Sequence, residues 1–167
     1  MSKISIRGRP DNNIPHIQIC SLEAAREADL DIYDGVITIE DTTTEDPLRV
    51  SGDNPRQLVL RFDDISRPID NFVMPDVKHI QSVFNFVKKW EQPSLLIHCH
   101  AGMSRSPAIS LAIIADKLGP GREVDAVNKL LEIVPLCTPN QYLIDLIDDT
   151  LECSGSLVKS VNDLIRF

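Results

Sequence analysis

The feature of the sequence that most restricts the fold is a short apolar segment followed closely by a helix that is apolar on nearly every side. Leu95-Leu96-Ile97 is too short for a helix and apolar on both faces, which predicts a strand in the middle of a sheet. From Pro107 to Leu118 apolar residues recur almost all round, which predicts a central, buried helix that ends at Gly119-Pro120. A central strand and a central helix together indicate a domain in which helices flank a sheet.

The rest of the chain supplies the neighbours of these two elements. Apolar and β-branched runs predict three more strands, over residues 17–19, 36–39 and 58–62. Helical spacing predicts a helix through residue 26 with Ser21 as its N-cap, and another between the N-cap Asp76 and Pro93. Further helices are predicted over residues 124–134, 139–151 and the last dozen residues. Thr138 to Gln141 resembles a capping box with Pro139 at the first helical position. The segment from Glu40 to Pro55 is polar and turn-rich, which predicts an exposed loop.

Strands that alternate with helices, followed by a run of helices, indicate an α/β fold. We expect a central, mostly parallel sheet of about four to five strands flanked by helices. Residues 1–167 are expected to form a single domain. Within it we expect an irregular lead-in over about residues 1–13 and a C-terminal tail or short helix over about residues 154–167.

Composition and charge argue against several classes of protein. The 17 basic and 25 acidic residues give a net charge of −8, which argues against broad binding to nucleic acid or to an anionic membrane. No apolar run approaches the ~20 residues needed to span a bilayer, and the N-terminus lacks the apolar stretch of a secretory signal. Four scattered cysteines are too few for a disulfide scaffold. We therefore expect a cytoplasmic monomer with no nucleic-acid or membrane partner.

The segment from His98 to Pro107 carries the strongest chemical signal. It joins the central strand to the central helix through a tight loop that contains Gly102, so the loop amides and the positive end of the helix dipole can surround one tetrahedral oxyanion. Arg105 can add a bidentate clamp on that anion. In the same field the thiol of Cys99 is expected to ionise easily, and a thiolate beneath a bound phosphate is a nucleophile aimed at phosphorus.

An acid pair, Asp63-Asp64, ends another predicted strand. In an open parallel sheet, ligands bind beyond the carboxyl ends of the strands. We therefore expect these carboxylates and Cys99 to emerge at the same edge of the sheet.

The run His98-Cys99, five residues, Arg105-Ser106 resembles the signature of the protein tyrosine phosphatase superfamily. The resemblance is to its compact dual-specificity branch, and especially to small bacterial members. Together with Gly102 these make five matching positions, which at roughly 5% background each give a chance match below about one in ten thousand over this length. The acid loop of the family is similar to Phe62-Asp63-Asp64, and the segment that opens a late helix is similar to Pro139-Asn140. The resemblance extends from about Val36 to Leu151.

The resemblance implies a role for each residue of the motif. Cys99 is expected to be the nucleophile that forms a cysteinyl-phosphate intermediate, and Ser106 to donate its hydroxyl to the sulfur. Asp64 is expected to protonate the leaving oxygen and then to activate water. The phosphate-binding loop comprises His100, Ala101, Gly102, Met103, Ser104 and Arg105. No metal or other cofactor is expected, because the amides and Arg105 supply the charge stabilisation.

Several residues keep a second interpretation. Asp63 is the alternative to Asp64 as the general acid, and Asp64 is preferred because the acid of the family usually follows an acidic residue. His98 is expected to order the loop, although the run from His98 to His100 also allows a metal site. Cys20 fits inert packing better than a disulfide with oxidised Cys99. The acidic stretch Asp41–Asp46 is most simply a solvated loop, and no residue that clamps a substrate ring can be named.

The function expected from these residues is the hydrolysis of a phosphorylated protein or a small phosphomonoester, with phosphotyrosine preferred and phosphoserine or phosphothreonine also allowed. A phosphatase of inositol phosphates, lipids or RNA is an alternative, which the lack of lysine in the loop disfavours. A pseudophosphatase that holds phosphorylated partners without cleaving them is a second alternative. Arsenate reduction fits less well, because the small reductases with such loops carry their cysteine near the start of the chain. Sulfur transfer also fits less well, because its loops generally lack the ending Gly-x-x-Arg-Ser.

Overall fold

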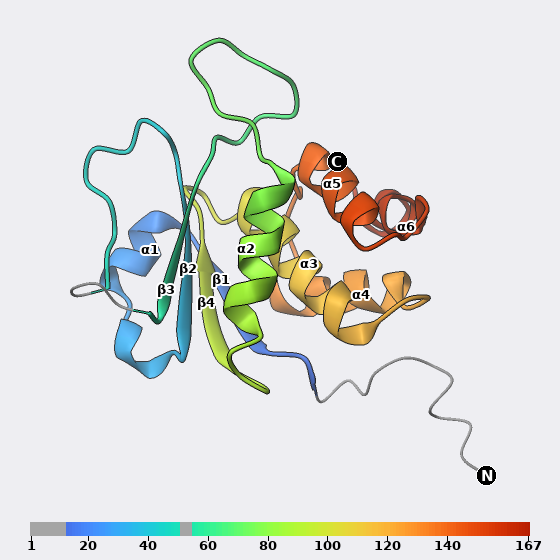
Figure 1. Ribbon diagram of the computed structural model, residues 1–167, viewed down its shortest axis with the longest axis horizontal. Helices are drawn as coiled ribbons and strands as arrows, with labels where there is room; N and C mark the ends of the chain where they lie inside the picture. Colours follow the sequence, from blue (N-terminus) through green and yellow to red (C-terminus); the bar gives the residue numbers. More distant parts are fainter. Residues whose placement is uncertain (1–12, 51–54) are drawn as a thin grey trace.

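Four parallel strands form the sheet of this computed structural model, which describes residues 13–50 and 55–167. The strands are β1 (His16–Cys20), β2 (Gly35–Glu40), β3 (Gln57–Arg61) and β4 (Ser94–His98). Their order across the sheet is β1-β4-β2-β3, so the strand that precedes the motif lies between β1 and β2 (Figure 1). The predicted α/β class, the parallel sheet and the central place of residues 95–97 are confirmed, while all but residue 13 of the predicted lead-in lies outside the described residues.

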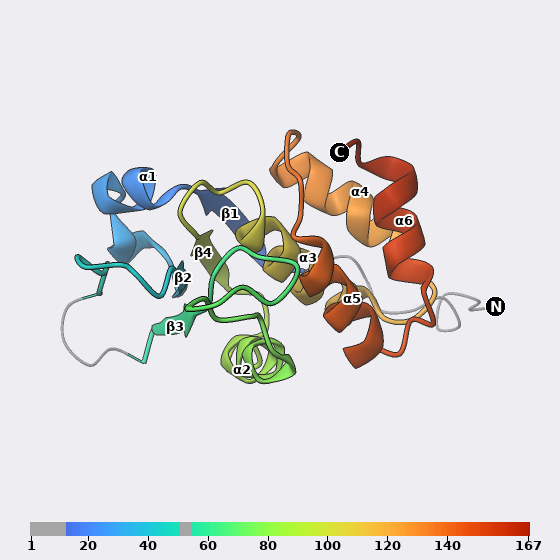
Figure 2. The same cartoon turned by 90° about the horizontal axis from the view of Figure 1, so that it is seen from above.

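Helices cover both faces of the sheet, as Figures 1 and 2 show. α1 (Leu22–Glu27) lies on one face, and α2 to α6 gather on the other. The bounds of these five helices are Val77–Val87, Arg105–Leu118, Glu123–Ile133, Gln141–Thr150 and Ser156–Leu164. A short 3-10 turn, η3 (Leu30–Ile32), precedes β2. No helix in the described ranges is both long and apolar enough to cross a bilayer.

The two faces follow from the alternation of side chains along the strands. Val36 and Leu96 point toward α1 and form a small apolar cluster with Ala25. Their neighbours Ile37 and Ile97 belong to the large core on the opposite face. The two inner strands, β2 and β4, are therefore buried on both sides, which is why the sequence of β4 is an uninterrupted apolar run.

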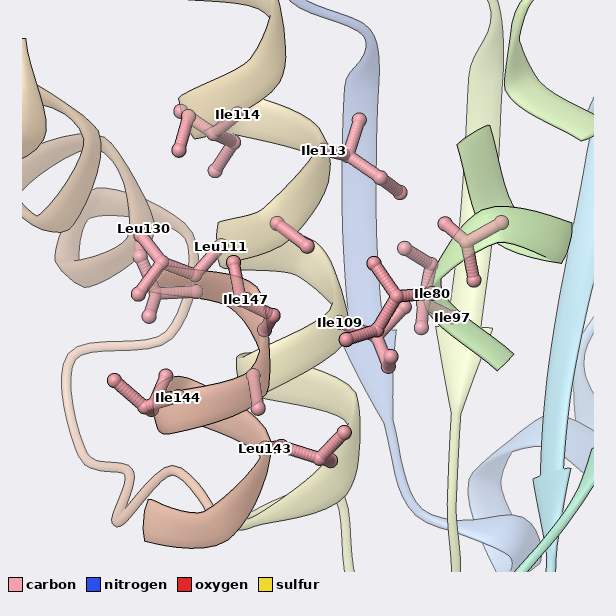
Figure 3. Close-up of a cluster of buried hydrophobic side chains, with 14 of the residues drawn as sticks. Ile80, Ile97, Ile109, Leu111, Ile113, Ile114, Leu130, Leu143, Ile144 and Ile147 are labelled. Atoms are coloured by element: carbon pink, nitrogen blue, oxygen red, sulfur yellow. The ribbon is translucent and has the colours of Figure 1, made fainter. Parts of the chain in front are cut away.

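α3 is apolar nearly all round because it packs on two sides at once. Figure 3 shows Ile109 and Ile113 directed toward Ile97 of β4 and Ile80 of α2. On the other side, Leu111 and Ile114 are directed toward α4 and α5, where they lie among Leu130, Ile144 and Ile147. All of these side chains are at most 2% exposed, so the helix that follows the motif is held rigidly between the sheet and the outer helices.

Side-chain caps define the starts of α1 and α5, and the second of these corrects a prediction. Ser21 caps α1 by accepting a hydrogen bond from the N–H of Ala24, as its position predicted. The cap of α5 is Asn140, whose side chain accepts from Leu143 N–H at 2.9 Å, so the prediction of Pro139 at the first helical position is wrong. Thr138 N–H donates to the carbonyl of Met103, which ties the segment before α5 to the motif loop.

The segment after β2 is exposed or half-buried over residues 41–49, as predicted, but the predicted loop includes Glu40, which is the buried last residue of β2. Glu40 is buried and forms two hydrogen bonds with Arg49 and one with Arg61. Burial raises the pKa of Glu40, but these two guanidinium partners outweigh it and hold the pKa below its ordinary value. Glu40 thereby links the end of β2 to Arg49 within the loop and to Arg61 at the end of β3.

Candidate active site

The carboxyl ends of the parallel strands bring the predicted residues together in one cleft of about 460 Å³. Thirteen residues line it: Asp41, Thr43, Asp63, Asp64, Ile65, Phe72, Cys99, His100, Ala101, Met103, Ser104, Arg105 and Thr138. They come from the loops that follow β2, β3 and β4, from the start of α3 and from the segment before α5. The expectation that Cys99 and the acid pair share one sheet edge is met by this arrangement.

The motif loop makes its tight turn at Gly102, which needs glycine for two reasons. Its φ is +75°, a region that L side chains rarely adopt. A Cβ atom there would also lie 2.8 Å from the backbone carbon and oxygen of Cys20 at the end of β1. The loop is tied to the start of α1 by a hydrogen bond from Leu22 N–H to the carbonyl of His100. The close approach of residues 20–22, at the end of β1, therefore restricts this turn to glycine.

Cys99 lies at the floor of the cleft and is 2% exposed. The N–H of Gly102 donates to its sulfur at 3.2 Å, a contact that favours negative charge on sulfur. Among the described residues, none accepts a hydrogen bond from the backbone N–H of Ala101, Met103 or Arg105. These residues lead into the N-terminus of α3, and an oxyanion bound there could satisfy their free donors.

Ser106 follows on the first turn of α3 and is fully buried. Its hydroxyl has no hydrogen-bond partner within the described ranges. A buried hydroxyl without a partner has a donor available, and the expected donation to the leaving sulfur stays a prediction.

Arg105 begins α3, and its side chain is 3% exposed. Its Nη1 donates to the carbonyl oxygen of Phe62 at 2.8 Å and lies 2.7 Å from a carboxylate oxygen of Asp41. Nε is buried and has no hydrogen-bond partner in the described part of the chain. Since an unpaired buried N–H is costly, this side of the guanidinium is suited to receive an oxyanion from the cleft.

His98 supports the loop from below and is 1% exposed. Burial lowers its pKa, so the ring is neutral at pH 7. Nδ1 lies 3.3 Å from the carbonyl oxygen of Cys99, which can only accept, so Nδ1 carries the proton. Nε2 accepts from the hydroxyl of Thr38 at 2.9 Å, and the same hydroxyl oxygen accepts from Gln57. Both ring nitrogens are occupied, which leaves neither for proton transfer or for a metal.

The two aspartates of the acid loop differ sharply in their surroundings. Asp63 is 4% exposed and accepts three hydrogen bonds, from the N–H and hydroxyl of Thr42 and from Val73 N–H. Burial raises its pKa, but these bonds and the charge of Arg105 outweigh it and hold the pKa below the ordinary value. Asp63 is therefore ionised at neutral pH and joins the loops after β2 and β3.

Asp64 is exposed and faces the cleft. One of its oxygens accepts from the hydroxyl of Ser104 at 2.8 Å and from the side-chain amide of Asn140 at 2.9 Å. The amide of Asn140 also donates to the carbonyl of Ile65 at 3.0 Å. Asp64 thus has a free oxygen and access to the cleft, which a proton donor needs and Asp63 lacks.

Replacing Asp63 with asparagine is expected to destabilise the protein by about 1–3 kcal/mol, because an amide nitrogen cannot accept from the donors on that side. The carboxylate contributes stability above the ordinary aspartate pKa, and that contribution is lost as pH falls through the lowered native value. The difference in the free energy of unfolding between wild type and Asp63→Asn should therefore be constant at neutral pH and narrow in acid. Urea titrations at several pH values measure it; a difference independent of pH down to strong acid would contradict this account.

Comparisons with known proteins bear on the fold. No family model of protein sequences matches the chain, and no curated protein does. Among solved structures, DUSP15 aligns with a TM-score of 0.58 and 20% identity over 92% of this chain and 95% of that one. A human tyrosine phosphatase-like serine/threonine/tyrosine-interacting protein gives a TM-score of 0.56 and 22% identity over 70% and 75% of the two chains. The chain has the fold of the compact dual-specificity phosphatases.

The same dual-specificity phosphatase fold is found in PTPMT1, solved in complex with PI(5)P, at a TM-score of 0.55 and 17% identity over 84% of this chain and 94% of that one. At these low identities, the similarity to the solved structures shows the fold alone.

Within the dual-specificity phosphatase fold, Cys20 lies beside the site rather than in it. It ends β1 opposite His98 and packs in the small cluster on the α1 face. Burial raises its pKa to about 11, with a further contribution from the charge of Cys99. All four cysteines are free thiols. Cys20 is therefore protonated at neutral pH, in keeping with inert packing.

Several residues of the site were not predicted from the sequence, and Asp41, Phe72 and Asn140 are the most informative of them. Asp41 had been assigned to a solvated acidic stretch, yet it contacts the buried guanidinium of Arg105. Phe72 lines the cleft with 48% of its surface exposed. Asn140 was matched to the family segment without a role, and it proves to link Asp64 to the start of α5. The position of Asp41 directly after a strand was the one signal that pointed to the sheet edge.

Proposed function

We propose that this protein is a cysteine-dependent phosphomonoester hydrolase that needs no metal, with phosphorylated protein as substrate. The observation that carries the proposal is that one cleft is lined by Cys99, Arg105 and the exposed carboxylate of Asp64. A nucleophile, an oxyanion clamp and a proton donor are the three groups that phosphoryl transfer to a thiolate requires.

The reaction proceeds in two steps. The thiolate of Cys99 attacks phosphorus while the bond to the leaving oxygen breaks, and protonated Asp64 transfers its proton to that oxygen. Loop amides and Arg105 stabilise the charge on the equatorial oxygens. In the second step ionised Asp64 removes a proton from water, whose oxygen attacks phosphorus and displaces the sulfur. Ser106 donates its hydroxyl to that sulfur, and phosphate leaves with the enzyme restored.

The walls of the cleft favour a phosphorylated side chain over a polyphosphorylated one. Phe72 and Met103 expose 48% and 43% of their surfaces at its rim and offer apolar contact to an aromatic ring. Three aspartates line the cleft and no lysine does, among the described residues. An inositol phosphate or phospholipid headgroup with several phosphates would meet repulsion there.

Turnover of p-nitrophenyl phosphate by the wild type in the presence of EDTA tests the proposed reaction. A phosphotyrosine peptide, a phosphoserine peptide of the same sequence, inositol hexakisphosphate and PI(5)P vesicles then separate the substrate classes. We expect hydrolysis of the aryl phosphate and of the phosphotyrosine peptide above the others. Binding of the peptide without any turnover would instead identify a phosphoprotein-binding module, and preference for PI(5)P would identify a lipid phosphatase.

Truncation of Phe72 to alanine is expected to raise KM for the phosphotyrosine peptide by about two- to tenfold, the range of a single aromatic contact. KM for the matched phosphoserine peptide should stay the same, because its phosphate sits on a short aliphatic arm. Ile69→Ala is the matched control: Ile69 is 42% exposed on the same loop and does not line the cleft. Equal effects of Phe72→Ala on both peptides would show that Phe72 does not recognise the ring.

A further inference from the structure

A second cavity lies at the end of α3 that is remote from the motif loop. Its volume is about 150 Å³, and the last turn of α3, the start of α4 and the turn between α5 and α6 enclose it. Among the described residues, it shares no lining residue with the cleft that holds Cys99. We propose that this cavity binds a small alkylammonium compound, whose charged nitrogen donates to the carboxylate of Glu123. The proposal does not depend on the proposed hydrolase function.

Glu123 is a buried acceptor without a donor. It is the first residue of α4, is 8% exposed and lines the cavity. Its Oε2 is buried and has no hydrogen-bond partner within the described ranges. Buried polar atoms in folded proteins almost always have a partner, and a carboxylate oxygen can only accept. What Glu123 lacks is therefore a hydrogen-bond donor supplied by a molecule in the cavity.

The charge around the cavity favours a cation as that donor. The carboxylates of Asp116 and Glu123 both line it. The guanidinium of Arg122 lines it too, but its Nε already donates to Asp125 at 2.8 Å. The last turn of α3 adds the negative end of a helix dipole. An anion would meet repulsion here, whereas an ammonium group would be attracted.

The thiol of Cys153, which also lines the cavity, responds to the same charge. Burial raises its pKa to about 11, with further contributions from the charges of Glu123 and Asp148. Negative charge on the sulfur is thus disfavoured, and Cys153 stays a neutral part of the wall at pH 7. The thiol therefore leaves the carboxylate of Glu123 as the group that a cation would contact.

The remaining walls suit a short alkyl chain. Ala115, Pro120 and Leu151 present apolar surface to the cavity. The turn that carries Leu151 is anchored by Asp148, which is 3% exposed and accepts from Gly155 N–H at 2.8 Å. This anchor holds the wall in place, so the cavity does not close by local collapse. An apolar cavity of about 150 Å³ accepts a molecule as large as benzene, and a four-carbon amine is smaller.

Titration of the wild-type protein with n-butylammonium chloride, followed by NMR of the backbone amides, tests the proposal. We expect the amide signals of Gly119 and Cys153, which line the cavity, to shift and to saturate. The dissociation constant should be about 1–10 mM, which is the range for so small a ligand. n-Butanol has the same length and no charge, and it should bind at least about tenfold more weakly. Sodium chloride keeps the ionic strength equal in the two titrations.

A pair of variants assigns the binding to one carboxylate. Glu123→Gln keeps the size of the side chain and removes its charge, so we expect it to bind n-butylammonium at least about tenfold more weakly than the wild type. Glu132→Gln is the matched control: Glu132 lies on the same helix, pairs with Lys129 and has a side chain that is 70% exposed. The control should bind within about twofold of the wild type, as surface pairs contribute little.

The proposal is overturned if the amide signals do not saturate up to about 100 mM n-butylammonium, which would mean that the cavity holds water only. It is also overturned if n-butanol binds as tightly as n-butylammonium, or if Glu123→Gln binds n-butylammonium as tightly as the wild type does. Thermal unfolding shows whether Glu123→Gln is folded. If it is not, the comparison of the two ligands on the wild type decides.

Discussion

Replacement of Cys99 by serine is expected to lower the turnover of aryl phosphates by about four orders of magnitude or more, since the hydroxyl is not ionised and is a far weaker nucleophile than a thiolate. Serine differs from cysteine by one atom and sits at the same floor of the cleft, where Cys99 is 2% exposed. The loop amides and Arg105 remain in place. Inorganic phosphate should therefore still bind to Cys99→Ser, and calorimetry can show this alongside the loss of turnover in EDTA.

Two controls make this result specific to the nucleophile. Cys137→Ser changes another buried thiol, 6% exposed, that does not line the cleft, and it should leave kcat/KM close to that of the wild type. Thermal unfolding of both variants shows whether a loss of activity comes from a loss of structure. If Cys99→Ser hydrolyses p-nitrophenyl phosphate as fast as the wild type, the proposed mechanism is wrong.

Replacement of Asp64 by asparagine is expected to reduce kcat by about a hundredfold to ten-thousandfold for phenyl phosphate, whose leaving oxygen needs a proton. The loss should be smaller for p-nitrophenyl phosphate, because nitrophenolate leaves without one. Stability should change little, since the carbonyl oxygen of the substituted amide can still accept from Ser104 and Asn140. Steady-state kinetics with both esters and urea unfolding measure these effects.

The pair Asp64→Asn and Asp63→Asn separates catalysis from support. The first is expected to lose activity with intact stability, and the second to lose stability, because Asp63 accepts three hydrogen bonds in the interior. The pH dependence adds a second criterion: the alkaline fall in kcat/KM, which reflects loss of the proton from the acid, should disappear in Asp64→Asn. An alkaline limb that is unchanged in that variant would count against Asp64 as the acid.

The strands, the helices and the motif could be predicted because each depends on the residues of one short, contiguous segment. Alternation and helical spacing within a few residues predicted the elements, and the motif predicted the loop from Cys99 to Arg105 as one contiguous piece. Glycine at position 102 was consistent with a turn, but the sequence did not show why a larger residue would be excluded there. Its missing Cβ makes room for the backbone of Cys20, which lies far earlier in the chain, at the end of β1.

The order of the strands in the sheet determined which further side chains reach the cleft, and the sequence did not show this order. The local sequence does not show that β2 pairs with β4. Asp41, which follows β2, was therefore predicted to be one carboxylate of a solvated acidic stretch. The pairing places it at the guanidinium of Arg105. Phe72, likewise, came to line the cleft only through the path of the loop after β3.

What the sequence alone determined about this protein is its set of reactive groups and the α/β fold that carries them, because both depend on the order of neighbouring residues. The tertiary structure decided how those groups differ. Asp63 and Asp64 are adjacent and chemically identical, yet one is buried among three donors and the other faces the cleft. Burial and hydrogen bonds from distant parts of the chain create that difference, and they exist only once the chain has folded.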